Sequence, residues 1–414
     1  MSDQIPSVVS PPPGNPRFPL FDGLRALAVL AVVATHASFV AGLTQSGLAK
    51  PLFANLDIGV SIFFAISGFL LYRPFVAADL GQRSMSTLRY ARRRFLRIVP
   101  LYWVALTVLA LVGSAHDVFT GDWWQFYFFA QVFSDSPDVR LGGIVQTWSL
   151  DLEVIFYVAL PFYAMAARRL LGGGNPRQRV RRDLGVLGAI AALSVLLRLV
   201  LLGAGSLDWV ERLPAFAGWF AIGMALAVIS ACSDEVPWAA AFAALVRRRT
   251  DLVALSAVFL YVAICISAPW FAGHLGSDLP TNAYAADVGY FVVKGVVAGL
   301  LVSIAAFATT NEHAVWPARL MRNRVLAWLG LISYGMFLWH MVILTDVVDR
   351  LGVLSLTSSS SVKMVGLVVF TTVVTVPVAA VSYYLIERPI LKLKEPRAIN
   401  IGMGGDVPPP SRLN

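Results

Sequence analysis

Ten apolar runs recur along this sequence, and their length constrains the fold more than any other feature. The runs cover residues 20–40, 57–76, 98–115, 146–167, 184–203, 213–231, 251–270, 285–308, 325–346 and 362–386. A helix needs about 20 apolar residues to cross the roughly 30 Å hydrocarbon core of a bilayer. Inside that core a single segment can satisfy its backbone hydrogen bonds only as a helix. We therefore predict an all-α, polytopic membrane protein with about ten transmembrane helices.

The composition excludes an ordinary soluble protein. Hydrophobic residues make up 57% of the 414 residues and charged residues only 14%, whereas soluble domains carry about 25% charged residues. The polar, Pro-rich residues 1–19 cannot bury enough apolar surface to fold. We predict a disordered cytoplasmic tail at 1–19, one transmembrane domain at 20–390 and a cytoplasmic tail at 391–414.

A further run, residues 123–133, is rich in aromatic residues and too short to cross the membrane. Aromatic side chains favour the level of the lipid headgroups. We predict that this run is a re-entrant or interfacial segment.

Arginines gather in alternate loops between the runs. Seven arginines lie between residues 73 and 97 and six between 168 and 183, whereas the intervening loops hold few basic residues. Positively charged loops remain in the cytoplasm, so an even number of spans places both termini there. We predict a multi-pass protein of the inner (plasma) membrane. These loops also account for the net charge of +9, so no nucleic-acid partner is expected.

Arg25 and His36 lie eleven residues apart in the first apolar run. Eleven residues make about three helical turns, so both side chains face the same side, about 16 Å apart along the axis. The residues between them are almost wholly apolar. A lone histidine in a helix is commonly structural, but ionisable groups inside a membrane are costly, and this pair favours a catalytic role.

Other polar residues in the spans leave alternatives open. His340, at a similar depth in the ninth run, either lines a site or is structural, and Arg198 and Lys294 either line a cavity or pair with an acid. Cys232 and Cys265 form no disulfide framework or metal motif, and we expect no metal and no bound cofactor. A secondary transporter or exporter is the alternative function, because intramembrane charges also suit a solute path.

Six short sequence motifs occur along the chain, and their order is informative. They are Arg25 with His36, Gly59-Val60 through Ser67-Gly68, Arg94 with Arg97, Trp148-Ser149-Leu150 through Glu153 and Tyr157, Leu329-Gly330 to His340, and Glu387-Arg388-Pro389. Over about residues 20–390 the chain thereby resembles the acyltransferase-3 family of bacterial membrane acyltransferases, with Val60 in place of the family's phenylalanine. Some members carry an extra C-terminal esterase-like domain, which we do not expect in this chain.

The resemblance implies that an acetyl or other short acyl group moves from cytoplasmic acyl-CoA to a hydroxyl of an envelope glycan, a glycolipid or a similar acceptor. An alcohol is a poor nucleophile at neutral pH, and histidine suits the task of taking its proton. His36 is then the general base, with Arg25 and Glu153 as further catalytic residues. Glu153 either orients the site or is an ordinary ion-pair acid. Acyl-CoA is a substrate here, not a bound cofactor.

The arginines beside the third span are candidates for donor binding. The guanidinium groups of Arg93, Arg94 and Arg97 suit the phosphate oxygens of CoA, although a basic loop also serves as a topology signal and contacts anionic lipids. Ser67 and Gly68 either leave a passage for the pantetheine arm or pack helices closely. The remaining candidate contacts to donor or acceptor are Tyr72, Trp148, Ser149, Tyr334 and His340.

Overall fold

The structure, a computed structural model, describes residues 18–41, 50–81, 86–171, 175–267, 281–309, 315–348, 352 and 360–393. Most of the two predicted tails, at 1–19 and 391–414, lies outside the described residues. In the described part of the chain every regular element is a helix.

The long helices are α1 (Leu20–Val40), α3 (Ile58–Asp79), α4 (Thr87–Leu111), α7 (Trp148–Leu171), α8 (Pro176–Gly203), α10 (Leu213–Cys232), α12 (Thr250–Ser267), α13 (Thr281–Phe307) and α18 (Ser360–Ser382). Shorter helices are α2 (Lys50–Ala54), α5 (Trp123–Tyr127), α6 (Pro137–Arg140), α9 (Leu207–Val210), α11 (Pro237–Arg248), α14 (Trp316–Met321), α15 (Arg324–Leu331), α16 (Ser333–Val342) and α19 (Arg388–Lys392). Single turns of 3₁₀-helix are η1 (Asn55–Asp57), η2 (His116–Phe119), η3 (Gln131–Phe133) and η4 (Val145–Thr147), and π-helical turns are η6 (Ile343–Val347) and η8 (Tyr383–Glu387).

The number of spans agrees with the sequence. Nine helices of the described residues are long and apolar enough to cross a membrane, and α15 with the segment Ser333–Val347 adds a tenth if that bent pair is one span. The predicted all-α architecture with about ten spans is confirmed. The aromatic run at 123–133 forms only the five-residue helix α5 and the turn η3, which are too short to span.

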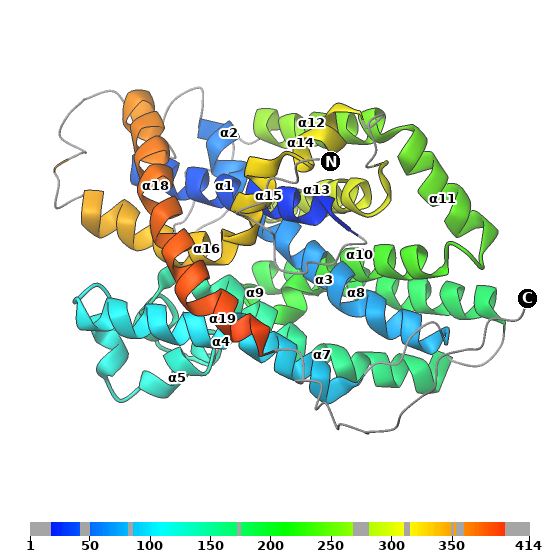
Figure 1. The fold of residues 1–414 in the computed structure, drawn as a ribbon, viewed down its shortest axis with the longest axis horizontal. Coiled ribbons are helices and arrows are strands. Elements are labelled where there is room, and N and C mark those ends of the chain that lie inside the picture. The colour runs from blue at the N-terminus through cyan, green and yellow to red at the C-terminus, as the bar shows by residue number, and fades with distance from the viewer. Residues whose placement is uncertain are drawn as a thin grey trace, which may run out of the picture.

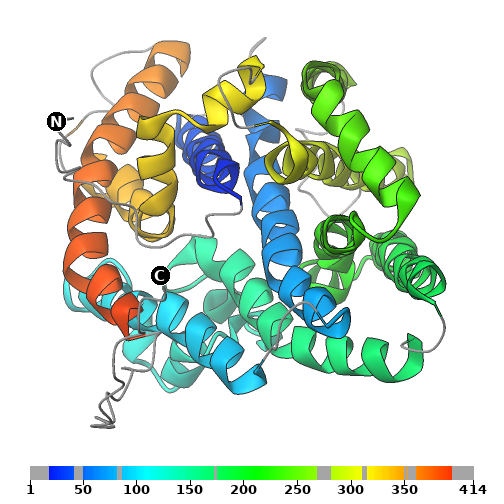
Figure 2. The same ribbon diagram turned by 45° about the vertical axis from the view of Figure 1, so that its right-hand side comes forward.

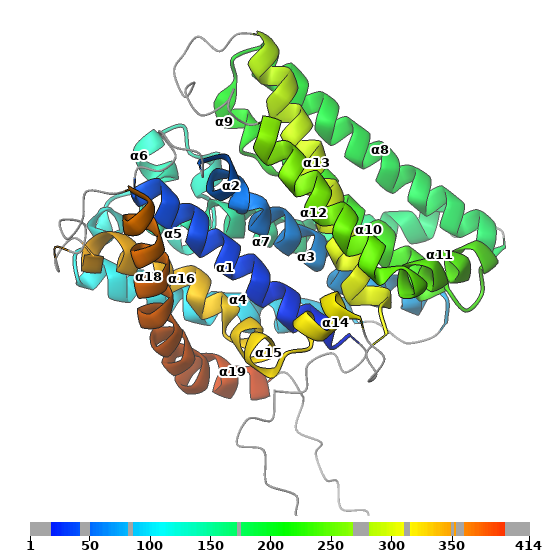
Figure 3. The ribbon, with the colours of Figure 1, turned by 90° about the horizontal axis from the view of Figure 1, so that it is seen from above.

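The central helices are α1 and α3 (Figure 1). Figures 2 and 3 show them between a group formed by α8, α10, α12 and α13 on one side and a group formed by α4, α16 and α18 on the other. Outward-facing leucine, valine and phenylalanine side chains are exposed on the peripheral helices, such as Leu193 on α8 and Val373 on α18. A surface of this kind suits contact with lipid.

Glycines bring the central helices close together. A Cβ at Gly68 of α3 would collide with the carbonyl oxygen of Phe220, and one at Gly223 of α10 would collide with that of Ala65. The two glycines face each other's helix, so α3 and α10 pack backbone to backbone, as small residues allow in membrane helices.

The ninth span is broken near Ile332, where α15 and the segment Ser333–Val347 meet at 69°. Gly330, at the end of α15, packs against the carbonyl oxygen of Asp22 on α1. Asn323 caps the start of α15 by accepting a hydrogen bond from the Val325 amide at 2.9 Å. The break turns α16 so that it faces α1 and α4, where the candidate site lies.

Candidate functional site

A cavity lies between α1, α3, α4, α7 and α16 and encloses about 850 Å³, a volume that includes its open mouth. Its polar lining consists of Arg25, Ser67, Arg94, Arg97, Ser149, Glu153, Tyr157, Ser333 and Tyr334. Its apolar lining consists of Val32, Val60, Phe63, Phe64, Ile66, Leu70, Leu71, Ile98, Leu150 and Phe337. Residues from five helices therefore bring charged groups to one internal space.

Three arginines line this cavity, and each is held differently. Arg25 pairs with Asp22 at 3.0 Å on its own helix. Arg97 pairs with Glu387, whose side chain is almost fully buried, at 3.5 Å. The Arg94 guanidinium lies 5.9 Å from the centroid of the Tyr157 ring, and its buried Nε has no hydrogen-bond partner among the described residues. Arg94 thus has hydrogen-bonding capacity left over.

Glu153 is the carboxylate of the cavity. One of its oxygens accepts hydrogen bonds from the hydroxyl of Ser67 on α3 and from the hydroxyl of Tyr157, one turn along α7, at 2.6 Å. Two donors on one oxygen fix the position of the side chain. The carboxylate therefore ties α3 to α7 across the cavity.

His36 forms a pair with His340 from α16. Nδ1 of His36 lies 3.0 Å from Nε2 of His340, and the ring centroids are 5.1 Å apart. His36 is half-buried and His340 is fully buried. Val32 and Phe337, one turn earlier on each helix, line the cavity. Neither imidazole is part of the cavity lining, which ends one helical turn away on each helix.

The structure brings together seven of the thirteen predicted site residues as lining of one cavity, namely Arg25, Ser67, Arg94, Arg97, Ser149, Glu153 and Tyr334. His36 and His340 lie together one turn beyond its end. Tyr334 lines the cavity with its hydroxyl bonded to the Ile98 carbonyl at 2.8 Å. Ser149 is buried and donates to the Gln146 carbonyl at 3.3 Å.

Four predicted site residues lie elsewhere. Gly68 packs against α10, so it makes a close helix contact and no passage. The hydroxyl of Tyr72 donates to Asp183 of α8 at 2.7 Å, in a separate cluster. Trp148 packs against Phe216, and Arg93 is exposed and does not line the cavity.

Sequence reasoning assigned no role to Tyr157. It follows Glu153 by four residues, a spacing that places both side chains on one face of a helix. That spacing was a signal that could have found it. Asp22, which holds Arg25, follows the same rule at a spacing of three.

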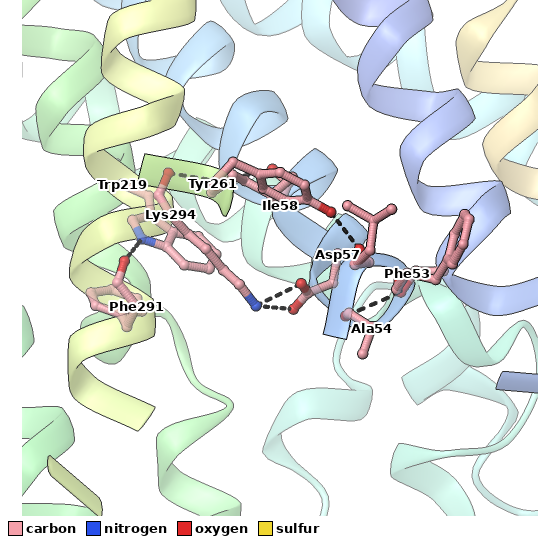
Figure 4. A network of polar contacts seen from close by, with 11 residues as sticks. Phe53, Ala54, Asp57, Ile58, Trp219, Tyr261, Phe291 and Lys294 are labelled. Atoms are coloured by element: carbon pink, nitrogen blue, oxygen red, sulfur yellow. Dashed lines mark hydrogen bonds and ion pairs between the residues drawn. The ribbon is translucent and has the colours of Figure 1, made fainter. Parts of the chain in front are cut away.

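Arg198 and Lys294, two further basic residues of the spans, are paired with acids. Lys294 of α13 donates to both carboxylate oxygens of Asp57, at 2.6 and 2.8 Å, and Figure 4 shows its amine pointing at them. Arg198 donates to Asp287 at 2.7 Å. Of the two alternatives, pairing with an acid describes both residues.

The structure groups no set of three or more His, Cys, Asp or Glu side chains suited to a metal within the described residues. Both cysteines are unpaired and buried. The site thus consists of arginines, a carboxylate, hydroxyls and two imidazoles.

Comparison with known proteins gives a family match over nearly the whole chain. The acyltransferase-3 family model, described as an acyltransferase domain, matches residues 19–384. No solved structure gives a significant match.

Three curated proteins illustrate the range of relatives. The peptidoglycan O-acetyltransferase OatA of Listeria monocytogenes is 26% identical over 90% of this chain and 56% of its own length. The putative peptidoglycan O-acetyltransferase YrhL of Bacillus subtilis is 24% identical over 90% of this chain and 54% of its own. The exopolysaccharide production protein ExoZ of Rhizobium meliloti is 24% identical over 84% and 93%. The chain spans about half the length of the first two relatives.

Proposed function

Because the chain belongs to the acyltransferase-3 family, we propose that it is a membrane O-acyltransferase that moves an acetyl or other short acyl group from acyl-CoA to a hydroxyl of an envelope glycan or glycolipid. The names of OatA, YrhL and ExoZ support a polysaccharide acceptor. The observation that carries the proposal is the charged cavity that leads along α1 from Arg25 to Val32, one turn from His36.

The donor enters at the arginine end of the cavity. CoA carries phosphates, and guanidinium groups bind phosphate oxygens through charge-assisted hydrogen bonds. Arg94 supplies such a group in the cavity wall, and Arg25 and Arg97 add positive charge beside it. Arginine-rich loops are cytoplasmic, which supports a donor arriving from the cytoplasm. The apolar lining from Leu70 to Val60 then suits the uncharged arm and the acyl group.

The acceptor meets the acyl group near His36. The imidazole takes the proton of the acceptor hydroxyl as the oxygen attacks the thioester carbonyl. When the tetrahedral intermediate collapses, the C–S bond breaks and the imidazolium returns the proton to the departing thiolate. The products are the ester and free CoA thiol. Because the cavity stops one turn short of His36, the walls at Val32 and Phe337 have to part when both substrates are bound.

The test is acyl transfer by the full chain in nanodiscs, with radiolabelled acetyl-CoA as donor and muropeptides or exopolysaccharide fragments as acceptors. We expect His36→Ala to lower the rate by on the order of 10²-fold or more, the usual contribution of a general base, while binding of acetyl-CoA stays unchanged. His116→Ala is the matched control, because His116 belongs to η2, outside the candidate spans.

Two outcomes would overturn the proposal. If His36→Ala transfers acyl groups at close to the rate of the unaltered chain, His36 is not the general base. Net solute flux into vesicles, without any covalent change of the solute, favours a transporter instead.

A further inference from the structure

The contacts of His340 determine where the protons of the two imidazoles reside. Nδ1 of His340 lies 2.8 Å from the carbonyl oxygen of Phe337 and 3.2 Å from that of Met336. A carbonyl oxygen can only accept a hydrogen bond. Nδ1 of His340 therefore carries a proton.

The second ring nitrogen of His340 must then be an acceptor. The ring is fully buried, and no acidic side chain of the described residues forms an ion pair or hydrogen bond with it. Because a buried cation without a carboxylate partner is costly, the ring is neutral, and its Nε2 keeps a lone pair. Nδ1 of His36, 3.0 Å away, is therefore the donor of the contact between the two rings.

The contact with His340 assigns the ring proton of a neutral His36 to Nδ1. A neutral imidazole carries a single proton, and that proton is on Nδ1. Its Nε2 has an unshared lone pair. The hydrogen bond made by one ring nitrogen generally decides which tautomer a histidine adopts.

We propose that His340 is a positioning residue, which holds His36 in the tautomer whose Nε2 can accept the proton of the acceptor hydroxyl. The inference rests on the proposed function for the meaning of that lone pair, but the proton positions stand on geometry alone. When Nε2 of His36 takes the proton, both nitrogens of His36 carry hydrogen. The Nδ1–H then points at the lone pair of His340, which stabilises the new positive charge until the proton passes to the CoA thiolate.

The backbone that orients His340 is itself held in place. Gln146 of η4 donates through Nε2 to the carbonyl oxygens of Phe337 at 3.0 Å and Leu338 at 3.1 Å. The Phe337 oxygen therefore accepts from both His340 and Gln146. This contact fastens α16 just below the ring, and it comes from the turn that leads into α7, the helix of Glu153.

Nitrogen NMR tests the proton positions directly. The chain has five histidines, so a sample labelled with ¹⁵N-histidine gives few ring signals, and His36→Ala and His340→Gln variants assign two of them. We expect a Nδ1–H tautomer for both rings in the unaltered chain in nanodiscs. A Nε2–H tautomer for His36 overturns the proposal, whatever the activity of any variant.

Two substitutions of His340 test the positioning role in catalysis. Glutamine keeps an acceptor near the position of Nε2, whereas leucine has a similar volume without one. We expect His340→Leu to lower kcat by on the order of 10-fold or more and to mix the His36 tautomers, with KM for acetyl-CoA changed by less than about twofold. His340→Gln should recover most of the rate and the single tautomer.

Equal losses of kcat in both variants, at equal thermal stability, overturn the acceptor role. The outcome is distinguishable from failure of the proposed function. If His36→Ala retains full transfer while NMR shows the Nδ1–H tautomer, the base is wrong and the proton assignment stands.

Discussion

Replacing Arg94 with glutamine should weaken binding of acetyl-CoA, because it removes a contact to the phosphates of CoA and no other contact to the donor. The guanidinium lines the cavity, and its buried Nε has no hydrogen-bond partner among the described residues. A hydrogen bond to a charged group contributes about 1.5–3 kcal/mol. Loss of one such bond raises the Kd for acetyl-CoA by roughly 10- to 150-fold. Because this bond is made before the reaction, kcat at saturating donor should change little.

Arg94 is a cleaner choice than Arg97 for this experiment. Arg97 forms an ion pair with the buried carboxylate of Glu387, so its removal mixes a folding defect with a binding defect. Arg89→Gln is the matched control. It removes the same charge from α4, and Arg89 is exposed and does not line the cavity.

The assay is equilibrium binding to the full chain in nanodiscs, with acetyl-CoA compared with acetyl-pantetheine. Acetyl-pantetheine lacks the nucleotide phosphates, so Arg94→Gln should bind it as well as the unaltered chain does. The effect on acetyl-CoA should also shrink as salt rises, since the interaction is ionic and the mouth of the cavity is open. If both donors lose affinity equally, Arg94 does not contact the phosphates, and the reasoning is refuted.

Three further predictions follow from the packing around the cavity. Tyr157→Phe removes one of the two hydroxyl donors to Glu153, and should cost about 1 kcal/mol of stability in a melting experiment and lower the transfer rate; no change in either contradicts the network. Gly223→Leu should prevent folding, judged by gel filtration, because α3 backbone occupies the space, whereas Gly289→Leu on α13 meets only open space. Val32→Phe fills the end of the cavity and should slow transfer without weakening acetyl-CoA binding, and normal transfer contradicts a route past Val32.

The number and extent of the spans could be predicted because bilayer thickness fixes the length of an apolar helix. The relation of Arg25 to His36 could be predicted as well, because helical periodicity is a local property. Both lie on α1 as the spacing requires, with Arg25 in the cavity wall. The break near Ile332 could not be predicted, because it depends on how α15 packs against Asp22.

Contacts between distant segments account for the remaining differences. His340 is 304 positions from His36, and no periodicity reports which span faces which. The same reason explains Gly68 and Tyr72. Each belongs to a helix that does line the cavity, but Gly68 packs against Phe220 on α10 and Tyr72 is bonded to Asp183 on α8. A motif can identify a helix of the site, but the face that each residue presents depends on the partner helices.

The partners of the intramembrane charges separate structural groups from candidate functional ones. Lys294 donates to both oxygens of Asp57, and Arg179 pairs with Asp79 between helices. Neither basic residue lines the cavity. Arg94 is different, since it lines the cavity and its buried Nε has no hydrogen-bond partner among the described residues. A buried polar group without a partner is costly. Asp57 supplies the acceptor oxygens for Lys294, and we expect the phosphate oxygens of a ligand to supply them for Arg94.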